Sequence, residues 1–364
     1  MNKLSSYQKA ATLITLLFIA FSVYLVYDAS SVWAAYKYGD AFYYLKRQSV
    51  YSIIAIVALF FGKKVPLEKA RKYAIPLLIF TNILLILVLI PGIGIMKGGS
   101  YSWLGFGSLS FQPSELYKLS LILFYASYLS DHFRDTVRFR TMIPLFLWLA
   151  AGGILIMLQP DFGTLVVIGG ALVVMLFLSK MKIRYFIFGG AFVAALFVAM
   201  ILMEPYRMQR IVSFIDPFAD PLGAGFQIIQ SMFALGPGGL IGEGINASVQ
   251  KYYYLPEPQT DFIFAIAVEE FGYLGGLIII GGYFLLFFYL YRIARLKNDQ
   301  FHYLLSMGLL ALIAVQVIIN LGVVTALFPV TGITLPFLSY GGSSLVMLSF
   351  SVGIIIGGKN KCAS

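Results

Sequence analysis

Ten apolar stretches recur along this chain, each near the roughly 20 residues that a helix needs to cross a bilayer. Of its 364 residues, 60% are hydrophobic and only 12% are charged, whereas a soluble domain carries roughly 25% charged residues. The predicted spans are residues 10–27, 47–62, 74–91, 115–130, 141–158, 163–179, 184–203, 262–291, 302–327 and 342–357. The sequence therefore predicts an all-α integral membrane protein, a single polytopic domain over residues 1–364.

The positions of the basic residues orient these spans. Cytoplasmic connectors carry an excess of Lys and Arg, and with the N-terminus placed inside, the six inner segments hold 18 of the 26 basic residues. These are Lys3, Lys9, Lys63, Lys64, Lys69, Arg71, Lys72, Arg134, Arg138, Arg140, Lys180, Lys182, Arg184, Arg292, Arg295, Lys297, Lys359 and Lys361. We therefore expect both termini in the cytoplasm. Topology then accounts for the net charge of +10, so no nucleic-acid partner is expected.

One long connector, about residues 204–261 between the seventh and eighth spans, faces outward in this topology. With the first residues of the eighth span it holds half of the acidic residues: Glu204, Asp216, Asp220, Glu243, Glu257, Asp261, Glu269 and Glu270. Its segment FQIIQSMFAL predicts a short amphipathic helix. Chemistry, if the protein performs any, is expected in this connector.

Charged residues at the two ends of this connector suggest different roles. The guanidinium groups of Arg207 and Arg210 suit phosphate, although interfacial anchoring is an equal alternative. Thr260 or Asp261 is expected to cap the eighth helix, with Asp261 on one face with Ala265 and Glu269. A carboxylate kept ionised by the helix dipole can accept a proton.

Three shorter outer connectors also place polar residues at span ends, where each is a functional candidate. Glu115 and Lys118 lie three residues apart on one helix face, Asp161 lies at a tight turn, and PVTGITLPFLSYGGSS follows a span that contains Asn320. Structural alternatives remain open: the Glu115–Lys118 pair could lock two helices together, and Asp161 could cap the sixth helix. Together with the long connector, they could line one outward-opening cavity.

Six segments of this sequence closely resemble the signatures of the SEDS family (shape, elongation, division and sporulation). They are FQPSELYK, QPDFGT, YRMQR, DPLGAGFQIIQS, YLPEPQTDFIFA and TGITLPFLSYGGSS. QKYYYLPEPQTDFIF and DASSVWA are most like the FtsW/SpoVE branch, and RodA is a more distant match. One departure is Ser102 in GSYSWLG, where many relatives have arginine, so no role of that arginine is transferred.

This resemblance implies a peptidoglycan glycosyltransferase in the bacterial cytoplasmic membrane. Such an enzyme polymerises lipid II, an undecaprenyl-pyrophosphate-linked substrate, into β-1,4 glycan strands during cell division or sporulation. Expected partners are a class B penicillin-binding protein, which is a transpeptidase, and other membrane proteins of division or elongation complexes.

The resemblance also implies roles for individual residues. Asp261 matches the family's essential aspartate and is the expected catalytic base. Expected substrate-binding residues are Glu115, Lys118, Asp161, Arg207, Arg210, Ser339, Gly341, Gly342 and Ser343. A divalent cation, Mg or Mn, could be held between carboxylates and the substrate's phosphates.

Two other functions fit the same features: a lipid II flippase or transporter, and a non-catalytic scaffold for a transpeptidase. Transporters also contain charged spans interrupted by Gly and Pro, but their sites usually lie near the membrane midplane. The candidate residues here cluster on the outer side, which favours the glycosyltransferase.

Overall fold

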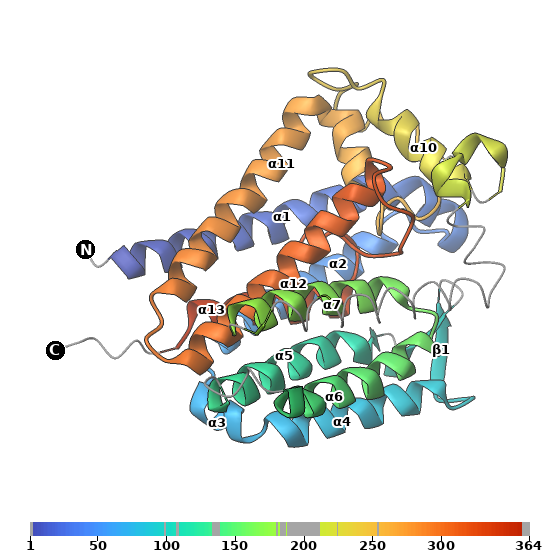
Figure 1. The fold of residues 1–364 in the computed structure, drawn as a ribbon. Helices are drawn as coiled ribbons and strands as arrows, with labels where there is room; N and C mark the ends of the chain where they lie inside the picture. Colours follow the sequence, from blue (N-terminus) through green and yellow to red (C-terminus); the bar gives the residue numbers. More distant parts are fainter. Residues whose placement is uncertain are drawn as a thin grey trace.

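The computed structural model describes residues 3–97, 100–106, 109–132, 139–179, 181–182, 187, 212–223, 225–252 and 255–358. Most of them are helical (Figure 1). Among the described residues, five helices are long and apolar enough to cross a membrane: α1 (Lys3–Tyr38), α2 (Tyr43–Lys64), α6 (Phe139–Met157), α11 (Ile263–Arg295) and α12 (Gln300–Val324). The remaining helical elements are α3 (Leu67–Lys72), α4 (Ala74–Leu89), α5 (Pro113–Asp131), α7 (Phe162–Leu178), η1 (Pro217–Ala219), α10 (Phe226–Leu235) and α13 (Gly342–Ile356).

Nine of the ten predicted spans coincide with helices, and the seventh, 184–203, lies almost wholly outside the described residues. α4 shows why the apolar pattern is reliable. Leu78 and Leu85 are buried, whereas Ile79 and Ile86 on other faces of the helix are 44% and 49% exposed. A helix that is apolar on all sides suits a bilayer, because lipid can cover the side that protein does not. The chain is a multi-pass membrane protein.

The prediction of an all-α fold was wrong for the connector between α4 and α5. This connector contains an antiparallel sheet of three strands in the order β1 (Gly94–Lys97), β2 (Ser100–Phe106) and β3 (Leu109–Phe111). In β2, Tyr101 and Gly105 are exposed whereas Ser102 and Leu104 are buried, the period of two expected of a strand. The Ser102 hydroxyl donates to the Gln159 carbonyl at 3.4 Å, so the sheet rests on the turn before α7.

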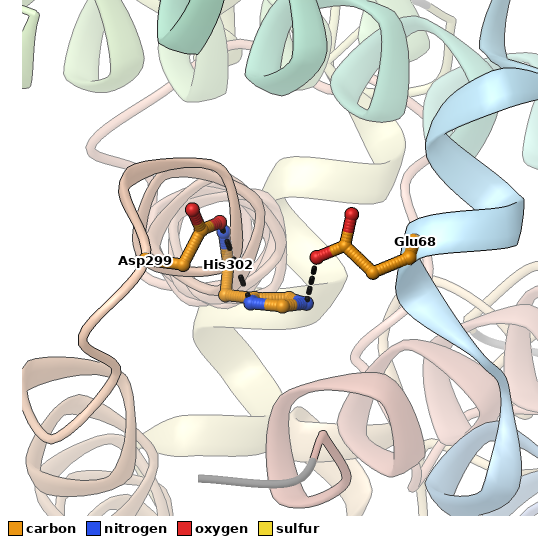
Figure 2. Close-up of side chains that lie close together, drawn as sticks. All are labelled: Glu68, Asp299 and His302. Carbon is orange, nitrogen blue, oxygen red and sulfur yellow. Dashed lines mark hydrogen bonds and ion pairs between the residues drawn. The ribbon is translucent and has the colours of Figure 1, made fainter. Parts of the chain in front are cut away.

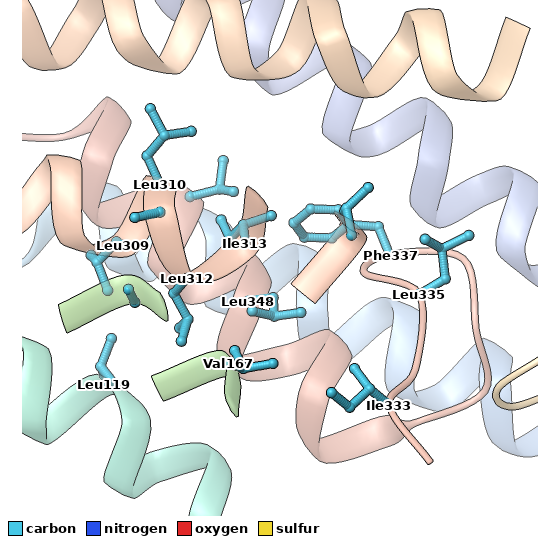
Figure 3. Close-up of a cluster of buried hydrophobic side chains, with 14 of the residues drawn as sticks. Leu119, Val167, Leu309, Leu310, Leu312, Ile313, Ile333, Leu335, Phe337 and Leu348 are labelled. Carbon is cyan, nitrogen blue, oxygen red and sulfur yellow. The ribbon is translucent and has the colours of Figure 1, made fainter. Parts of the chain in front are cut away.

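The core surrounds α12, whose most apolar window is 78% buried. Figure 3 shows Leu309 and Ile313 of α12 packed with Val167 of α7 and Leu348 of α13. Phe337, from the segment that joins α12 to α13, belongs to the same buried cluster (Figure 3). This segment, residues 325–341, is here called the connecting segment. Its burial brings an irregular piece of chain into the interior, where its backbone needs polar partners.

α11 is not one continuous helix, because Gly272 has a non-helical conformation (φ 67°, ψ −174°). A glycine-rich segment, residues 236–244, packs against this break. The Tyr273 amide donates to the Gly239 carbonyl at 2.9 Å and the Leu274 amide to the Leu240 carbonyl at 3.2 Å. In return, the Glu243 amide donates to the Glu269 carbonyl at 2.9 Å. The predicted eighth span is therefore two helical pieces joined through this segment.

The first piece, residues 263–271, is almost entirely buried, and we refer to it as the buried arm. The second piece exposes apolar side chains such as Leu277 and Ile278, at 62% and 74%. The predicted short helix at FQIIQSMFAL is confirmed as α10, which joins α12 through a 2.8 Å hydrogen bond from the Ser231 hydroxyl to the Val324 carbonyl.

Replacing Gly272 with alanine is expected to destabilise the fold by about 1–3 kcal/mol. A Cβ there would lie 2.4 Å from the Leu240 carbonyl oxygen, on a residue with positive φ. The matched control is Gly281→Ala, because a Cβ at this helical position meets no atom within 4 Å. Thermal unfolding in detergent micelles should show a lower Tm for Gly272→Ala and an equal or slightly higher Tm for Gly281→Ala. Equal values for both variants would contradict the conformation at Gly272.

Candidate active site

The predicted connectors meet at the end of the bundle where α5, α7, α11 and α13 begin. A Cβ on Gly163 of α7 would lie 2.7 Å from the Thr331 carbonyl oxygen. On the other side of the same stretch, the ideal Cβ position of Gly332 is 3.8 Å from Asp261 Oδ2. Residues 331–333 of the connecting segment therefore lie between the start of α7 and the turn that carries Asp261.

Asp161 caps α7, as the structural alternative for this residue predicted. Its Oδ1 accepts from the Thr164 amide at 3.1 Å, and its Oδ2 accepts from the Thr164 hydroxyl at 2.8 Å. The Gln112 side-chain amide also donates to Asp161 Oδ2, at 3.2 Å. The Gln112 main-chain amide donates to Ser343 Oγ at 3.0 Å. Asp161 thus links α7 to Gln112 at the start of α5, and Gln112 in turn binds Ser343 of α13. A substrate role for Asp161 stays a prediction.

Glu115 and Lys118 form a buried ion pair with 2.9 Å between Nζ and Oε1. They are only 6% and 3% exposed, so their charges are well removed from water. Lys118 Nζ also donates to Gln316 Oε1 of α12 at 3.3 Å, and Gln316 Nε2 donates to the Thr334 carbonyl at 3.1 Å. The pair therefore ties α5 to α12, as the alternative of a helix-locking pair predicted. Glu115 Oε2 is buried without a hydrogen-bond partner among the described residues.

Asp261 lies on the turn before α11 and is half-buried. The prediction that Thr260 or Asp261 caps this helix was wrong, because the N-cap residue is Phe262. Asp261 therefore precedes the helix and shares no helix face with Ala265 and Glu269, both of which are buried.

The main chain around Asp261 is held by two elements. Asn320 Nδ2 of α12 donates to the Asp261 carbonyl at 2.8 Å and to the Ile333 carbonyl at 2.7 Å. The Tyr340 amide donates to the Gln259 carbonyl at 2.8 Å. A carboxylate whose backbone is fixed in this way keeps a defined position relative to the connecting segment.

The remaining predicted site residues at this end have structural partners of their own. Ser339 Oγ accepts from the Leu335 amide at 2.8 Å, and Gly341 is the N-cap of α13. A Cβ on Gly342 would lie 2.4 Å from the Tyr51 ring, so any larger residue there would require that ring to move. Contacts of Ser339, Gly341, Gly342 and Ser343 with a substrate stay predictions. Arg207 and Arg210 lie outside the described residues.

Two residues at the site were missed from the sequence: Gln112 and Gln316. Gln316 lies four residues before Asn320, so the two amides share one face of an otherwise apolar helix. Polar side chains repeated at that spacing in a predicted span were the available signal. Gln112 was inside a quoted motif, but nothing in the sequence indicated its contact with Asp161.

Among the described residues, one group has the composition and spacing to hold a metal ion: Glu68, Asp299 and His302. Figure 2 shows the His302 ring between the two carboxylates, with Nε2 3.7 Å from Glu68 and Nδ1 3.4 Å from Asp299. The two nitrogens face different carboxylates, and Asp299 already caps α12 by accepting from the His302 amide at 3.0 Å. The group lies beside the start of α12, whereas Asn320, near the other end of that helix, holds Asp261.

A divalent cation between carboxylates and phosphate would need the substrate to complete its ligands. That expectation stays a prediction.

Comparisons with known proteins identify related chains along the whole length. A family model covering FtsW, RodA and SpoVE, described as cell cycle protein, matches residues 8–360. Stage V sporulation protein E of Bacillus subtilis is 46% identical over 345 residues, 94% of each chain. The probable peptidoglycan glycosyltransferase FtsW of Trichlorobacter lovleyi is 39% identical over 361 residues, covering 97% of this chain and 93% of that protein.

Two solved structures are also similar. A chain from "Structural coordination of polymerization and crosslinking by a peptidoglycan synthase complex" aligns with a TM-score of 0.77 and 31% identity, over 94% of this chain and 95% of that chain. Thermus thermophilus rod shape determining protein RodA aligns with a TM-score of 0.69 and 26% identity, over 95% and 94%.

Removing only one partner of the Glu115–Lys118 pair is expected to be strongly destabilising. Lys118→Met should cost about 3–5 kcal/mol, because it leaves a buried carboxylate uncompensated. The double variant Glu115→Gln with Lys118→Met removes both charges and should recover most of the lost Tm in detergent micelles. If the double variant is as unstable as Lys118→Met, the loss does not come from an unpaired charge.

Proposed function

Because this chain belongs to the FtsW, RodA and SpoVE family of cell cycle proteins and is a peptidoglycan glycosyltransferase, we propose that it polymerises lipid II at the outer face of the bacterial cytoplasmic membrane. The observation that best supports this proposal is the position of Asp261: its main chain is held by hydrogen bonds at the place where the polar connectors meet. The glycan would serve cell division or sporulation, as the printed names of its relatives suggest.

The orientation is supported by the basic residues at the opposite end of the bundle. There, Arg71 pairs with Asp131 at the end of α5, and Lys297 Nζ donates to the Gly357 carbonyl after α13. Gln8 near the start of α1 donates to the Ile356 carbonyl at 2.7 Å, so the two ends of the described chain meet there (Figure 1). Basic connectors favour the cytoplasm, which would place Asp261 on the outer side.

In the proposed reaction, the Asp261 carboxylate accepts the proton of the 4-hydroxyl on the acceptor sugar. The freed oxygen attacks the anomeric carbon of the donor sugar as its bond to the diphosphate breaks. Undecaprenyl diphosphate leaves with that electron pair. Attack opposite the leaving group converts an α-linked donor into a β-1,4 linkage. The main-chain bonds from Asn320 and Tyr340 would keep the base in position.

Negative charge develops on the departing diphosphate, and cationic donors stabilise it. We assign this role to Arg207 and Arg210, whose forked guanidinium groups match phosphate oxygens. Lys118 was also a candidate, but its ammonium is already paired with Glu115. We therefore place Lys118 and Glu115 in the wall of the site. Mg or Mn at the diphosphate stays part of the proposal, and no step here depends on it.

We also propose a partner that crosslinks the glycan. One solved structure with a similar chain is described as a peptidoglycan synthase complex that coordinates polymerization and crosslinking. A class B penicillin-binding protein with transpeptidase activity fits this description. Other membrane proteins of a division or elongation complex would join the same assembly.

Replacing Asp261 with asparagine is expected to lower glycan formation from purified lipid II by about 10²–10⁴-fold, the usual contribution of a general base. The matched control is Asp299→Asn, which removes a carboxylate at the opposite end and keeps a good N-cap. Gel analysis of glycan products, with and without the transpeptidase partner, measures both variants. Near-normal polymerisation by Asp261→Asn would reject Asp261 as the base.

The same preparation separates the alternative functions. A flippase would move lipid II across proteoliposomes without forming glycan. If the protein is instead a non-catalytic scaffold, the Asp261→Asn variant would support its transpeptidase partner as well as the wild-type protein does.

Arg207→Ala and Arg210→Ala are each expected to lower kcat/KM for glycan formation roughly ten- to hundredfold, with a fall in kcat. Each variant loses a charge-assisted hydrogen bond to the departing diphosphate. Arg292→Ala is the control, because Arg292 lies at the opposite end and its guanidinium contacts Tyr7. Initial rates over a range of lipid II concentrations give KM and kcat separately. If kcat and KM are both unchanged, the two arginines have the alternative role of interfacial anchors.

A further inference from the structure

A second buried cluster of charges lies away from Asp261, where the long connector meets α1 and α11. Lys251 Nζ donates to Asp28 Oδ1 of α1 at 2.9 Å, to Glu270 Oε1 of α11 at 2.9 Å and to Asn246 Oδ1 at 2.7 Å. Lys251, Asp28 and Glu270 are 2%, 3% and 1% exposed. One ammonium therefore joins three segments that are far apart in sequence.

The neighbouring Glu269 binds the same turn of the connector. Its carboxylate accepts from the Ser248 hydroxyl at 2.6 Å, the Val249 amide at 2.8 Å and the Gln250 amide at 3.3 Å. The Ser248 amide donates to Glu270 Oε1 at 3.2 Å. Residues 246–251 are thus held on two consecutive glutamates at the end of the buried arm, directly before the break at Gly272.

The charge balance of this cluster makes Lys251 its key member. Two carboxylates, those of Asp28 and Glu270, share one ammonium. Asp28 Oδ2 and Glu270 Oε2 are buried without partners among the described residues. Burial alone would lower the pKa of Lys251, but its hydrogen bonds to Asp28 and Glu270 outweigh this and raise the pKa above its ordinary value. Lys251 therefore stays charged. Without it, two buried carboxylates would face each other unpaired, which is strongly unfavourable.

We propose that Lys251 is a positioning residue for the polymerisation reaction: it latches the connector to α1 and to the buried arm and thereby holds Asp261 in place. The inference rests on the proposed function of Asp261. The arm is held at the Asp261 end by Asn320 and at its other end by this cluster. Glu270 lies nine positions after Asp261, a distance of about 13 Å along a helix. If the contact between Lys251 and Glu270 shifts, the short, rigid helix would therefore transmit the displacement to the catalytic carboxylate.

The first test replaces Lys251 with methionine in the full-length protein with its transpeptidase. We expect kcat for glycan formation to fall about 100-fold, as for a displaced catalytic group, with KM for lipid II little changed. Hydrogen exchange of the amides of residues 243–252 should become at least about 100-fold faster, because their buried acceptors lose the compensating charge. Lys46→Met is the matched control: the Lys46–Asp40 ion pair is exposed, at 69% and 35%, and its loss should change neither readout.

A triple variant separates a latch from a direct substrate contact. Asp28→Asn, Lys251→Met and Glu270→Gln together remove Lys251 and both carboxylates that pair with it, so neither carboxylate is left without its counter-charge. A latch predicts that kcat and exchange protection return to within about tenfold of wild type, since neutral replacements of buried ion pairs are often tolerated. If Lys251 instead binds substrate phosphate, the triple variant stays inactive, and the proposal is overturned. This comparison also decides the matter if Lys251→Met alone does not fold.

Two further results would overturn the proposal that Lys251 positions Asp261. They are an unchanged kcat in Lys251→Met, or unchanged amide hydrogen exchange in residues 243–252 of that variant. Failure of the proposed function would look different. In that case wild type forms no glycan, or Asp261→Asn remains active, while the exchange data still report whether Lys251 holds the connector.

Discussion

A helix that breaks inside a membrane protein must pass its freed backbone groups to another segment, because lipid offers no hydrogen-bond partner. At Gly272 this constraint is met by the glycine-rich segment, whose main chain pairs with residues on both sides of the break. Because of the break, α11 consists of two units. One is an apolar helix that exposes its side chains at the protein surface, and the other is the buried arm. The arm's direction, and with it the position of Asp261, depends on that pairing.

The same rule explains the polar side chains in α12. Gln316 and Asn320 are almost fully buried, and both donate to carbonyl groups of the connecting segment. The connecting segment can therefore run through the core without leaving those carbonyls unsatisfied. Gln316 also receives a hydrogen bond from Lys118. One face of a single helix thus links the Glu115–Lys118 pair to the turn that carries Asp261.

Sequence reasoning predicted the features that depend on local pattern. Apolar length located nine helices, capping chemistry anticipated Asp161, and the spacing of Glu115 and Lys118 anticipated their pairing. Features that depend on distant contacts were missed. The strands at 94–111 are too short to stand out beside the spans, and Gly272 looked like one more small residue in an apolar helix. The partners of Lys251 lie 223 and 19 residues away, so no local pattern could join them.

Glycines in α13 and at its C-cap also restrict how the tail of the proposed lipid-linked substrate could reach the site. A Cβ on Gly353 would lie 2.2 Å from the Leu59 carbonyl oxygen, and one on Gly357 would lie 2.5 Å from the Lys63 carbonyl oxygen. At the other end of α13, Gly342 is in contact with the Tyr51 ring. α2 and α13 are therefore closed against each other along the full length of α13. That seam leaves no room for an acyl chain, so the lipid-linked substrate proposed above would have to enter the protein from another side of the bundle.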